Sequence, residues 1–281
     1  MKKHYLLTIG LGILTSPLAA TLLVEESFEQ TPVGNDLDTT STNGIGLSGS
    51  WSNSGGDYIM QSGSLGYGSL ATSGNSIITD STTDSIAHNT ISASLTGSPE
   101  VWFSFTFQTD SLSTNPKYLF ALANDRIGSM FGSSINNSGT GFGIDLKSGT
   151  AGTYTGGTNG NVFVSGTDSA DISVDTPIFI VGKIRWDVDV EGTATDILEL
   201  YQPSSSDLST EGAVVSTASG TFTNADLTTV SLGSRQNAGT IFDELRFGTT
   251  YADVAPVPEP SAFALLSGFL GLTWIMLRRR R

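Results

Sequence analysis

The chain has 281 residues, of which Gly, Ser and Thr supply 106, and only 14% are charged. This composition favours strands and turns over helices, while 38% hydrophobic residues suffice for a packed core, so collagen and coiled coils are excluded. Residues 21–260 hold 7 basic residues against 27 acidic ones, a net charge of −20, so a nucleic acid would be repelled and no nucleic-acid partner is expected.

The first 20 residues have the three parts of a secretory signal peptide in the usual order. Lys2 and Lys3 precede an apolar run over residues 5–14, and small residues end the segment at Ala20. We expect cleavage after Ala20. Because the chain has no cysteine, the exported part must fold without disulfides.

The body of the chain, residues 21–255, predicts one antiparallel β-sandwich. Short apolar-alternating runs separated by clusters of Gly, Ser, Thr, Asn and Asp are typical of this fold class. Strands are expected at residues 22–28, 102–107, 179–186, 196–201 and 241–247.

The segment 102–107 shows the clearest alternation and puts its three phenylalanines on one face. We predict that it and residues 179–186 are central strands. Residues 196–201 are expected to pair with 179–186 through a turn near Gly192. The terminal strands of the body are also expected to pair with each other, which brings the two ends of the domain together.

His88 is the only imidazole of the body and hence the one candidate for Ser-His-Asp chemistry. It lies in a polar segment that we predict to be a loop, and no nucleophile elbow accompanies it, so we interpret it as a surface residue. The glycine-rich residues 139–143 and 156–160 lack the lysine and helix of a phosphate loop. We predict that they form turns or bulges.

The sharpest catalytic candidate is the alternating acidic run of Asp187, Asp189 and Glu191. In a strand these side chains point the same way, and retaining glycosidases need two carboxyls about 5 to 5.5 Å apart. Because Gly192 follows at once, an exposed acidic hairpin tip is the favoured interpretation. Asp187 and Glu191 remain the carboxyl pair of an alternative function, a secreted glycoside hydrolase.

Residues 243–246, with the sequence Asp-Glu-Leu-Arg, also alternate. Asp243 and Leu245 are expected on one face, Glu244 and Arg246 on the other, as a solvated ion pair. Calcium stays open as a ligand, because hard cations need only loop oxygens and the body is rich in Asp. No calcium-loop spacing is found, so no metal ligand, no other cofactor and no catalytic residue is predicted.

The C-terminal end carries a second targeting segment. The tripeptide Pro258, Glu259 and Pro260 precedes the apolar residues 262–277, which as a helix of about 1.5 Å per residue barely span a hydrocarbon core of about 30 Å. Four basic residues then close the chain and would hold that end in the cytoplasm: Arg278, Arg279, Arg280 and Arg281.

The combination of tripeptide, hydrophobic helix and arginine cluster closely resembles the PEP-CTERM sorting signal of Gram-negative bacteria. The resemblance implies that a membrane-embedded exosortase recognises the tripeptide and removes the tail. We expect a protein that is exported through the inner membrane, is transiently anchored there by its C-terminal helix, and ends at the cell surface or outside the cell.

The body resembles the concanavalin A-like, laminin G-like jelly rolls. The likeness is carried by residues 24–29, 49–52, 102–107, 180–187 and 241–254. It implies a jelly-roll β-sandwich of two packed sheets, a fold in which relatives bind sugars or calcium. We predict three parts: a signal peptide (1–20), the sandwich (21–255) and the sorting signal (256–281). The favoured function is a non-catalytic surface or matrix protein whose jelly roll either binds glycans or only packs into an extracellular polysaccharide layer, with the exosortase as its other partner.

Overall fold

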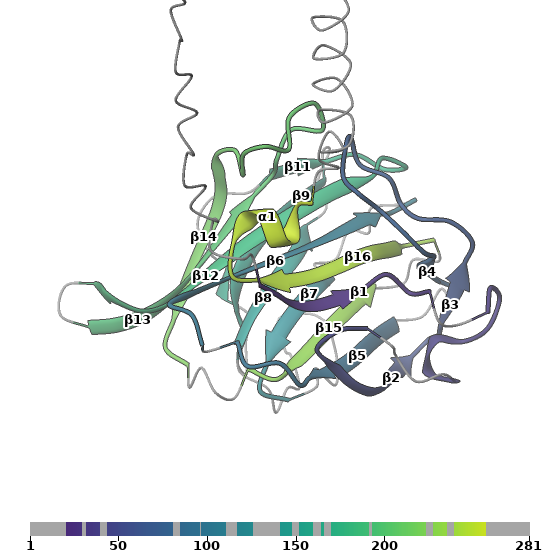
Figure 1. The fold of residues 1–281 in the computed structure, drawn as a ribbon, viewed down its shortest axis with the longest axis horizontal. Helices are drawn as coiled ribbons and strands as arrows, with labels where there is room; N and C mark the ends of the chain where they lie inside the picture. The colour runs from purple at the N-terminus through teal and green to yellow at the C-terminus, as the bar shows by residue number, and fades with distance from the viewer. Residues whose placement is uncertain are drawn as a thin grey trace, which may run out of the picture.

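The computed structural model describes residues 21–29, 32–39, 44–80, 85–95, 97–110, 117–125, 141–147, 152–159, 164–165, 170–190, 193–222, 227–234 and 239–256. In this part of the chain every sheet pairing between strands is antiparallel, and two sheets pack face to face (Figure 1). The predicted all-β antiparallel sandwich is confirmed.

The first sheet runs in the order β14-β13-β12-β6-β16-β4-β3. Both β1 and β4 pair with β16, β4 with its first residues and β1 with its last. The central strands of this sheet alternate apolar and polar residues, which suits a strand with two different faces. The strands are β1 (Leu22–Glu26), β3 (Tyr58–Gln61), β4 (Ser76–Thr79), β6 (Glu100–Gln108), β12 (Ile178–Val190), β13 (Thr193–Tyr201), β14 (Val214–Gly220) and β16 (Ile241–Gly248).

The second sheet runs in the order β10-β9-β8-β7-β15-β5-β2, and β11 pairs with β9. Its strands are β2 (Leu47–Gly55), β5 (Ser85–Ile91), β7 (Lys117–Ala123), β8 (Gly141–Lys147), β9 (Gly152–Asn159), β10 (Val164–Ser165), β11 (Ala170–Ile172) and β15 (Thr229–Ser234). A short 3-10 helix, η1 (Leu37–Thr39), precedes β2, and the helix α1 (Tyr251–Val254) follows β16.

The main core lies between the two sheets and is rich in aromatic rings. Phe103 and Phe105 of β6 stack on Phe120 of β7, with ring centroids 4.7 and 5.2 Å apart. All three side chains are at most 1% exposed. The alternation of residues 102–107 correctly placed the three phenylalanines on one face, and the structure shows that this face enters the sandwich.

The outer face of the first sheet, which faces away from the second sheet, is also buried. A second apolar cluster forms there around Trp102, Phe179 and Tyr201, together with Leu70 and Val254 from outside the strands. Figure 1 shows α1 lying over β6 and β16 on this face. The β3–β4 connection, residues 62–75, and the segment after β13 complete the cover. The sequence pattern gave no sign of this third layer.

Both predicted strand pairings are confirmed. β12 and β13 form an antiparallel hairpin, and β1 pairs with β16, so the two ends of the domain meet. Both β6 and β12 lie inside the sheet, as predicted. Within the described ranges no helix is long and apolar enough to cross a membrane. The predicted signal peptide and the predicted membrane helix at 262–277 lie outside the described residues.

Two predictions about loops are wrong. His88 lies in the middle of strand β5 and is half-buried, not in a surface loop. The glycines in the two runs stand largely in strands: Gly141 and Gly143 belong to β8 and Gly157 to β9. A Cβ at Gly141 would overlap the Leu122 carbonyl of β7, so the glycine allows close backbone approach rather than a turn.

Candidate functional site

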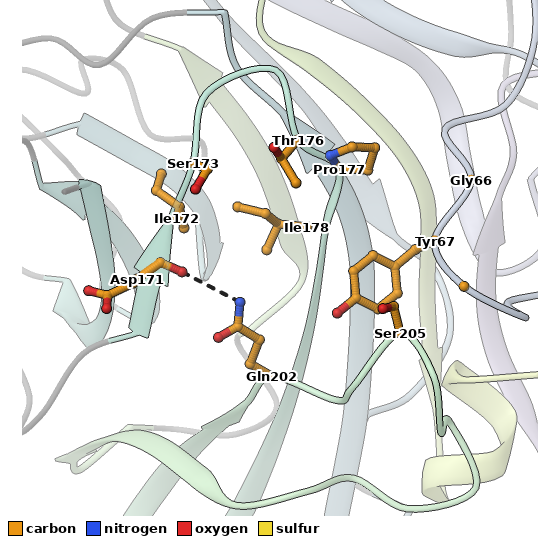
Figure 2. Close-up of a pocket in the computed structure, with 11 residues that line it drawn as sticks. Gly66, Tyr67, Asp171, Ile172, Ser173, Thr176, Pro177, Ile178, Gln202 and Ser205 are labelled. Atoms are coloured by element: carbon orange, nitrogen blue, oxygen red, sulfur yellow. Dashed lines mark hydrogen bonds between the residues drawn. The ribbon is translucent and has the colours of Figure 1, made fainter.

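A pocket of about 400 Å³ opens where three separate segments of the chain meet (Figure 2). The first runs from the end of β11 to the start of β12, the second follows β13, and the third is the tip of the β3–β4 connection. The lining consists of Gly66, Tyr67, Gly68, Asp171, Ile172, Ser173, Thr176, Pro177, Ile178, Gln202 and Ser205.

The pocket has an apolar centre and a polar rim. Figure 2 shows Ile178 and the ring of Tyr67 facing the same space, and Ile172 lies beside them. Hydroxyl and amide groups of serine, threonine and Gln202 surround this centre, and the Gln202 amide donates to the Asp171 backbone carbonyl at 3.5 Å. Among the described residues, the lining contains one carboxylate, that of Asp171, and no basic side chain.

Tyr67 is held in place from two sides. Its hydroxyl donates to the Pro203 carbonyl at 2.7 Å, and its ring packs on Phe179 with centroids 5.7 Å apart. Gly68 follows with φ +56°, and a Cβ there would overlap the Ser205 carbonyl. Burial raises the pKa of Tyr67, so its hydroxyl stays protonated and keeps donating at neutral pH.

The β3–β4 connection that carries Tyr67 is anchored on β16. The Asp243 carboxylate accepts from the Ser64 hydroxyl at 2.5 Å and from the Leu65 amide at 2.7 Å. Further along, the Glu244 carboxylate accepts from the Ser73 amide at 2.5 Å. Both ends of this connection, residues 62–75, are thereby fixed to two adjacent residues of one strand. We call these residues the pocket loop.

A β-bulge in β16 makes this anchoring geometrically feasible. The register with β6 shifts between Asp243 and Arg246, and Glu244 has φ +54°. The bulge breaks the strict alternation, so Asp243, Glu244 and Arg246 all contact the connection on the outer face, while Leu245 packs in the main core. The prediction that Asp243 shares the face of Leu245 is wrong.

These charged groups are buried rather than solvated, contrary to prediction. Asp243 and Glu244 are each 1% exposed and Arg246 is 4% exposed. The Arg246 guanidinium contacts Glu244 at 2.6 Å and Glu25 of β1 at 3.3 Å. Burial raises the pKa of Asp243 to about 7 despite the hydrogen bonds from Ser64 and Leu65, and burial also raises the pKa of Glu244 against the effect of Arg246. The connection covers these groups, which explains the difference from a solvated pair.

A second polar group on the same face is a closed ion network. Glu199 contacts Lys183 at 2.9 Å and Arg185 at 2.7 Å, and Lys183 also lies 5.0 Å above the ring of Trp102. Burial works against the charge of Lys183, but hydrogen bonds with Glu199 and Tyr201 raise its pKa overall. Because the cations are already paired, we interpret this network as part of the packing of β12 on β13.

Of the predicted carboxyl pair, Asp187 and Glu191, the structure describes only Asp187. Asp187 is exposed with φ +50°, at a bulge where the register of β12 with β13 shifts. Its amide donates to the buried carboxylate of Asp196 at 3.0 Å. Glu191 lies outside the described residues, as do the sorting residues Pro258, Glu259 and Pro260 and the four terminal arginines.

Among the residues that the structure describes, no three His, Cys, Asp or Glu side chains are close enough to hold a metal. The pocket could not be predicted from the sequence, because its lining comes from three segments that lie far apart in the chain. One signal was present: Tyr67 is an aromatic residue between two glycines in a segment that is otherwise mostly polar.

A scan of protein families and a search of curated proteins find no match to the chain. Solved structures do resemble it. The globular domain of T. cruzi calreticulin is 11% identical with a TM-score of 0.52, and the alignment covers 92% of this chain and 100% of that domain. At this identity the likeness shows the fold alone.

Two further solved structures are more distant. Domain 4 of AbnA, a GH43 extracellular arabinanase from Geobacillus stearothermophilus solved with arabinotriose, is 17% identical with a TM-score of 0.45, and the alignment covers 85% of this chain and 99% of that one. The cellulose-induced protein Cip1 is 10% identical with a TM-score of 0.40, and the alignment covers 71% of this chain and 91% of that one.

Proposed function

We propose that the protein is a non-catalytic glycan-binding protein of the cell surface or extracellular matrix, and that the Tyr67 pocket takes an uncharged sugar. The observation that carries this proposal is an aromatic ring beside an apolar floor, surrounded by hydroxyl and amide groups. The C–H face of a sugar ring packs on an aromatic ring, and its hydroxyls pair with groups that both donate and accept.

The charges of the pocket lining favour neutral glycans over acidic ones. The described part of the lining contains no lysine or arginine to pair with a uronate or sulfate, and Asp171 would repel one. The pocket volume of about 400 Å³ lies in the lower part of the range of small-molecule sites, which suits one or two sugar units of a longer chain. A neutral glycan is therefore the expected ligand.

The route of the protein to the surface is proposed from its two ends. The signal peptide up to Ala20 supports export, and the Pro258-Glu259-Pro260 tripeptide with its apolar run and arginines supports sorting by an exosortase of a Gram-negative bacterium. In this proposal the membrane is a partner only until the tail is removed. Intact mass of the protein recovered from its host tests this: a dominant extracellular form that keeps Arg278 to Arg281 would contradict sorting.

The binding proposal is tested with a glycan array that carries neutral and acidic oligosaccharides, run beside a reducing-sugar assay on β-glucans. We expect the full chain to bind neutral glycans and to release no reducing ends. Tyr67→Ala should abolish binding, whereas the control Tyr67→Phe, which keeps the ring and loses only the hydrogen bond to Pro203, should retain it. Equal binding by all three proteins, or hydrolysis of a glucan, would refute the proposal.

A further inference from the structure

Two adjacent buried carboxylates of β16 share one hydroxyl of the pocket loop. The Ser64 oxygen lies 2.5 Å from an Asp243 oxygen and 3.3 Å from a Glu244 oxygen. A serine hydroxyl has one proton and can donate to only one of the two carboxylates at a time. The other carboxylate then depends on its remaining donors, which are the backbone amides of Leu65 and Glu244 for Asp243 and the Ser73 amide with Arg246 for Glu244, or it takes up a proton itself.

The charges around this pair do not balance. Arg246 of β16 faces it, and Glu25 of β1 lies on the far side of Arg246 with its side chain 33% exposed. From β6, Thr106 contributes a hydroxyl bond to the Asp243 backbone carbonyl, and residues 62–75 contain no charged side chain. Arg246 thus compensates Glu244 at 2.6 Å, whereas Asp243 forms no ion pair with any residue that the structure describes.

We propose that Asp243 and Glu244 take up one proton that they share through Ser64, and that this proton determines how firmly the pocket loop is held on the first sheet. With the proton on Asp243, the acid donates to the Ser64 oxygen while the Ser64 proton turns to Glu244. The amides of Leu65 and Ser73 keep their carboxyl acceptors in both states. Loss of the proton leaves two buried negative charges side by side, which favours opening of the loop into water.

The direction of the pH dependence follows from the burial of the acid. Burial raises the pKa of Asp243 from its ordinary value of 3.8 to about 7, so the closed loop binds the proton far more tightly than an open, hydrated one. The loop is therefore held most firmly below about pH 4 and opens more readily as the pH rises to about 7, with no further change above that. Asp243 is a positioning residue in this account, because it acts on the pocket through the loop that carries Tyr67.

A consequence for ligand binding rests on the proposed function. A pocket that needs the closed loop loses apparent affinity in proportion to the fraction of open molecules. Glycan affinity should accordingly be higher at about pH 5 than at about pH 8, and this difference should vanish in Asp243→Asn, which is neutral at every pH and keeps an acceptor for Leu65.

The direct test is amide hydrogen exchange of the full chain, corrected for the intrinsic pH dependence of exchange. For the amides of Leu65 and Ser73 we expect the opening constant to rise about tenfold per pH unit between about pH 5 and 7, since one pKa unit is a tenfold change. Asp243→Asn should remove this slope, and the control Asp38→Asn, which neutralises an exposed carboxylate on η1, should keep it. A flat wild-type profile, or a slope that survives in Asp243→Asn, overturns the inference.

If Asp243→Asn does not fold, carbon-detected NMR titration of the carboxyl groups in the wild-type protein decides instead. The pair should take up a proton near pH 7, and ionisation of both groups below about pH 5 overturns the inference. Neither measurement uses a glycan. If no glycan binds at any pH while the loop follows the predicted profile, the proposed function fails and the shared proton stands.

Discussion

The two faces of β6 are both buried, yet they are built from opposite chemistry. On the inner face, Phe103, Phe105 and Phe107 are 0% exposed and pack against rings of the same and the opposite sheet. On the outer face, Ser104 and Thr106 are equally inaccessible but have polar partners, and the Ser104 hydroxyl donates to the Val254 carbonyl of α1 at 2.6 Å. The inner face is covered by a regular sheet, whereas the outer face is covered by irregular chain that brings its own donors and acceptors.

This difference predicts that the inner face mainly determines the stability of the domain, whereas the outer face determines the shape of the pocket. The inner face contributes apolar burial, which is large and insensitive to pH. The outer face contributes hydrogen bonds and buried charges, and the loop that these hold also forms the wall of the pocket. We therefore expect inner-face changes to unfold the domain and outer-face changes to alter the pocket and the response to pH.

The largest effect is expected for Phe105→Ala on the inner face. The ring is 0% exposed and stacks on Phe120, so its removal leaves a cavity between two rigid sheets. The free energy of unfolding should fall by about 4 kcal/mol, as measured by denaturant titration. A loss below about 1 kcal/mol would show that the two sheets are not closely packed there.

A slightly smaller effect is expected for Arg246→Met, the change that removes the cation of the outer face. Glu244 would then be a buried carboxylate without its ion pair, and Ala71 would lose a donor to its carbonyl. We expect a loss of about 3 kcal/mol at neutral pH, with much of it regained when the carboxyl is protonated in acid. An unchanged midpoint of denaturation at pH 7 would mean that the ion pair is not buried.

The outer face could be predicted only in part, and residues 241–247 show why. Their apolar alternation predicted a strand, which β16 confirms. The left-handed conformation of Glu244 comes from contacts with a loop more than 160 residues away in the chain, and no local pattern of β16 encodes such a contact. Residues 62–75 have no periodicity, so neither their position nor the pocket could be derived, although the aromatic Tyr67 in this polar segment was an indication.

The strand pairings of the first sheet, in contrast, could be predicted from the sequence. The hairpin of β12 and β13 was predictable because an apolar run, a glycine at 192 and a second alternating run lie next to each other in sequence. The pairing of β1 with β16 required only that the ends of a compact domain meet. The wrong prediction for His88 has the same origin as the missed loop, since a polar strand such as β5 has no hydrophobic period to identify it.

The pH dependence of global stability is a further difference expected between the inner and the outer face of β6. Because burial raises the pKa of Asp243 to about 7, the folded state binds this proton more tightly than the unfolded chain does, and the contribution of Asp243 to stability falls as the pH rises from about 4 to 7. The expected contribution is at most about 1.4 kcal/mol per pH unit in that window. It is measured as the difference between wild type and Asp243→Asn, and a difference that does not change with pH would contradict the assignment.

The smallest effect is expected for Asp187→Asn. This residue is exposed at a bulge, and asparagine tolerates the left-handed backbone conformation that it adopts. The free energy of unfolding should change by no more than about 0.5 kcal/mol, with glycan binding unaffected. Loss of a hydrolytic activity in this variant would favour the alternative function and place Asp187 in an active site.

The central claim, that the loop on the outer face builds a neutral-glycan site, is tested most directly by an NMR titration of the full chain with the best ligand from the array. We predict saturable shift changes at Tyr67, Ile172, Gln202 and Ser205, which line the pocket from different segments, and none at His88 on the second sheet. The same titration of Tyr67→Ala should show no saturation. Shift changes that gather on the second sheet and leave the pocket residues unmoved would contradict the account.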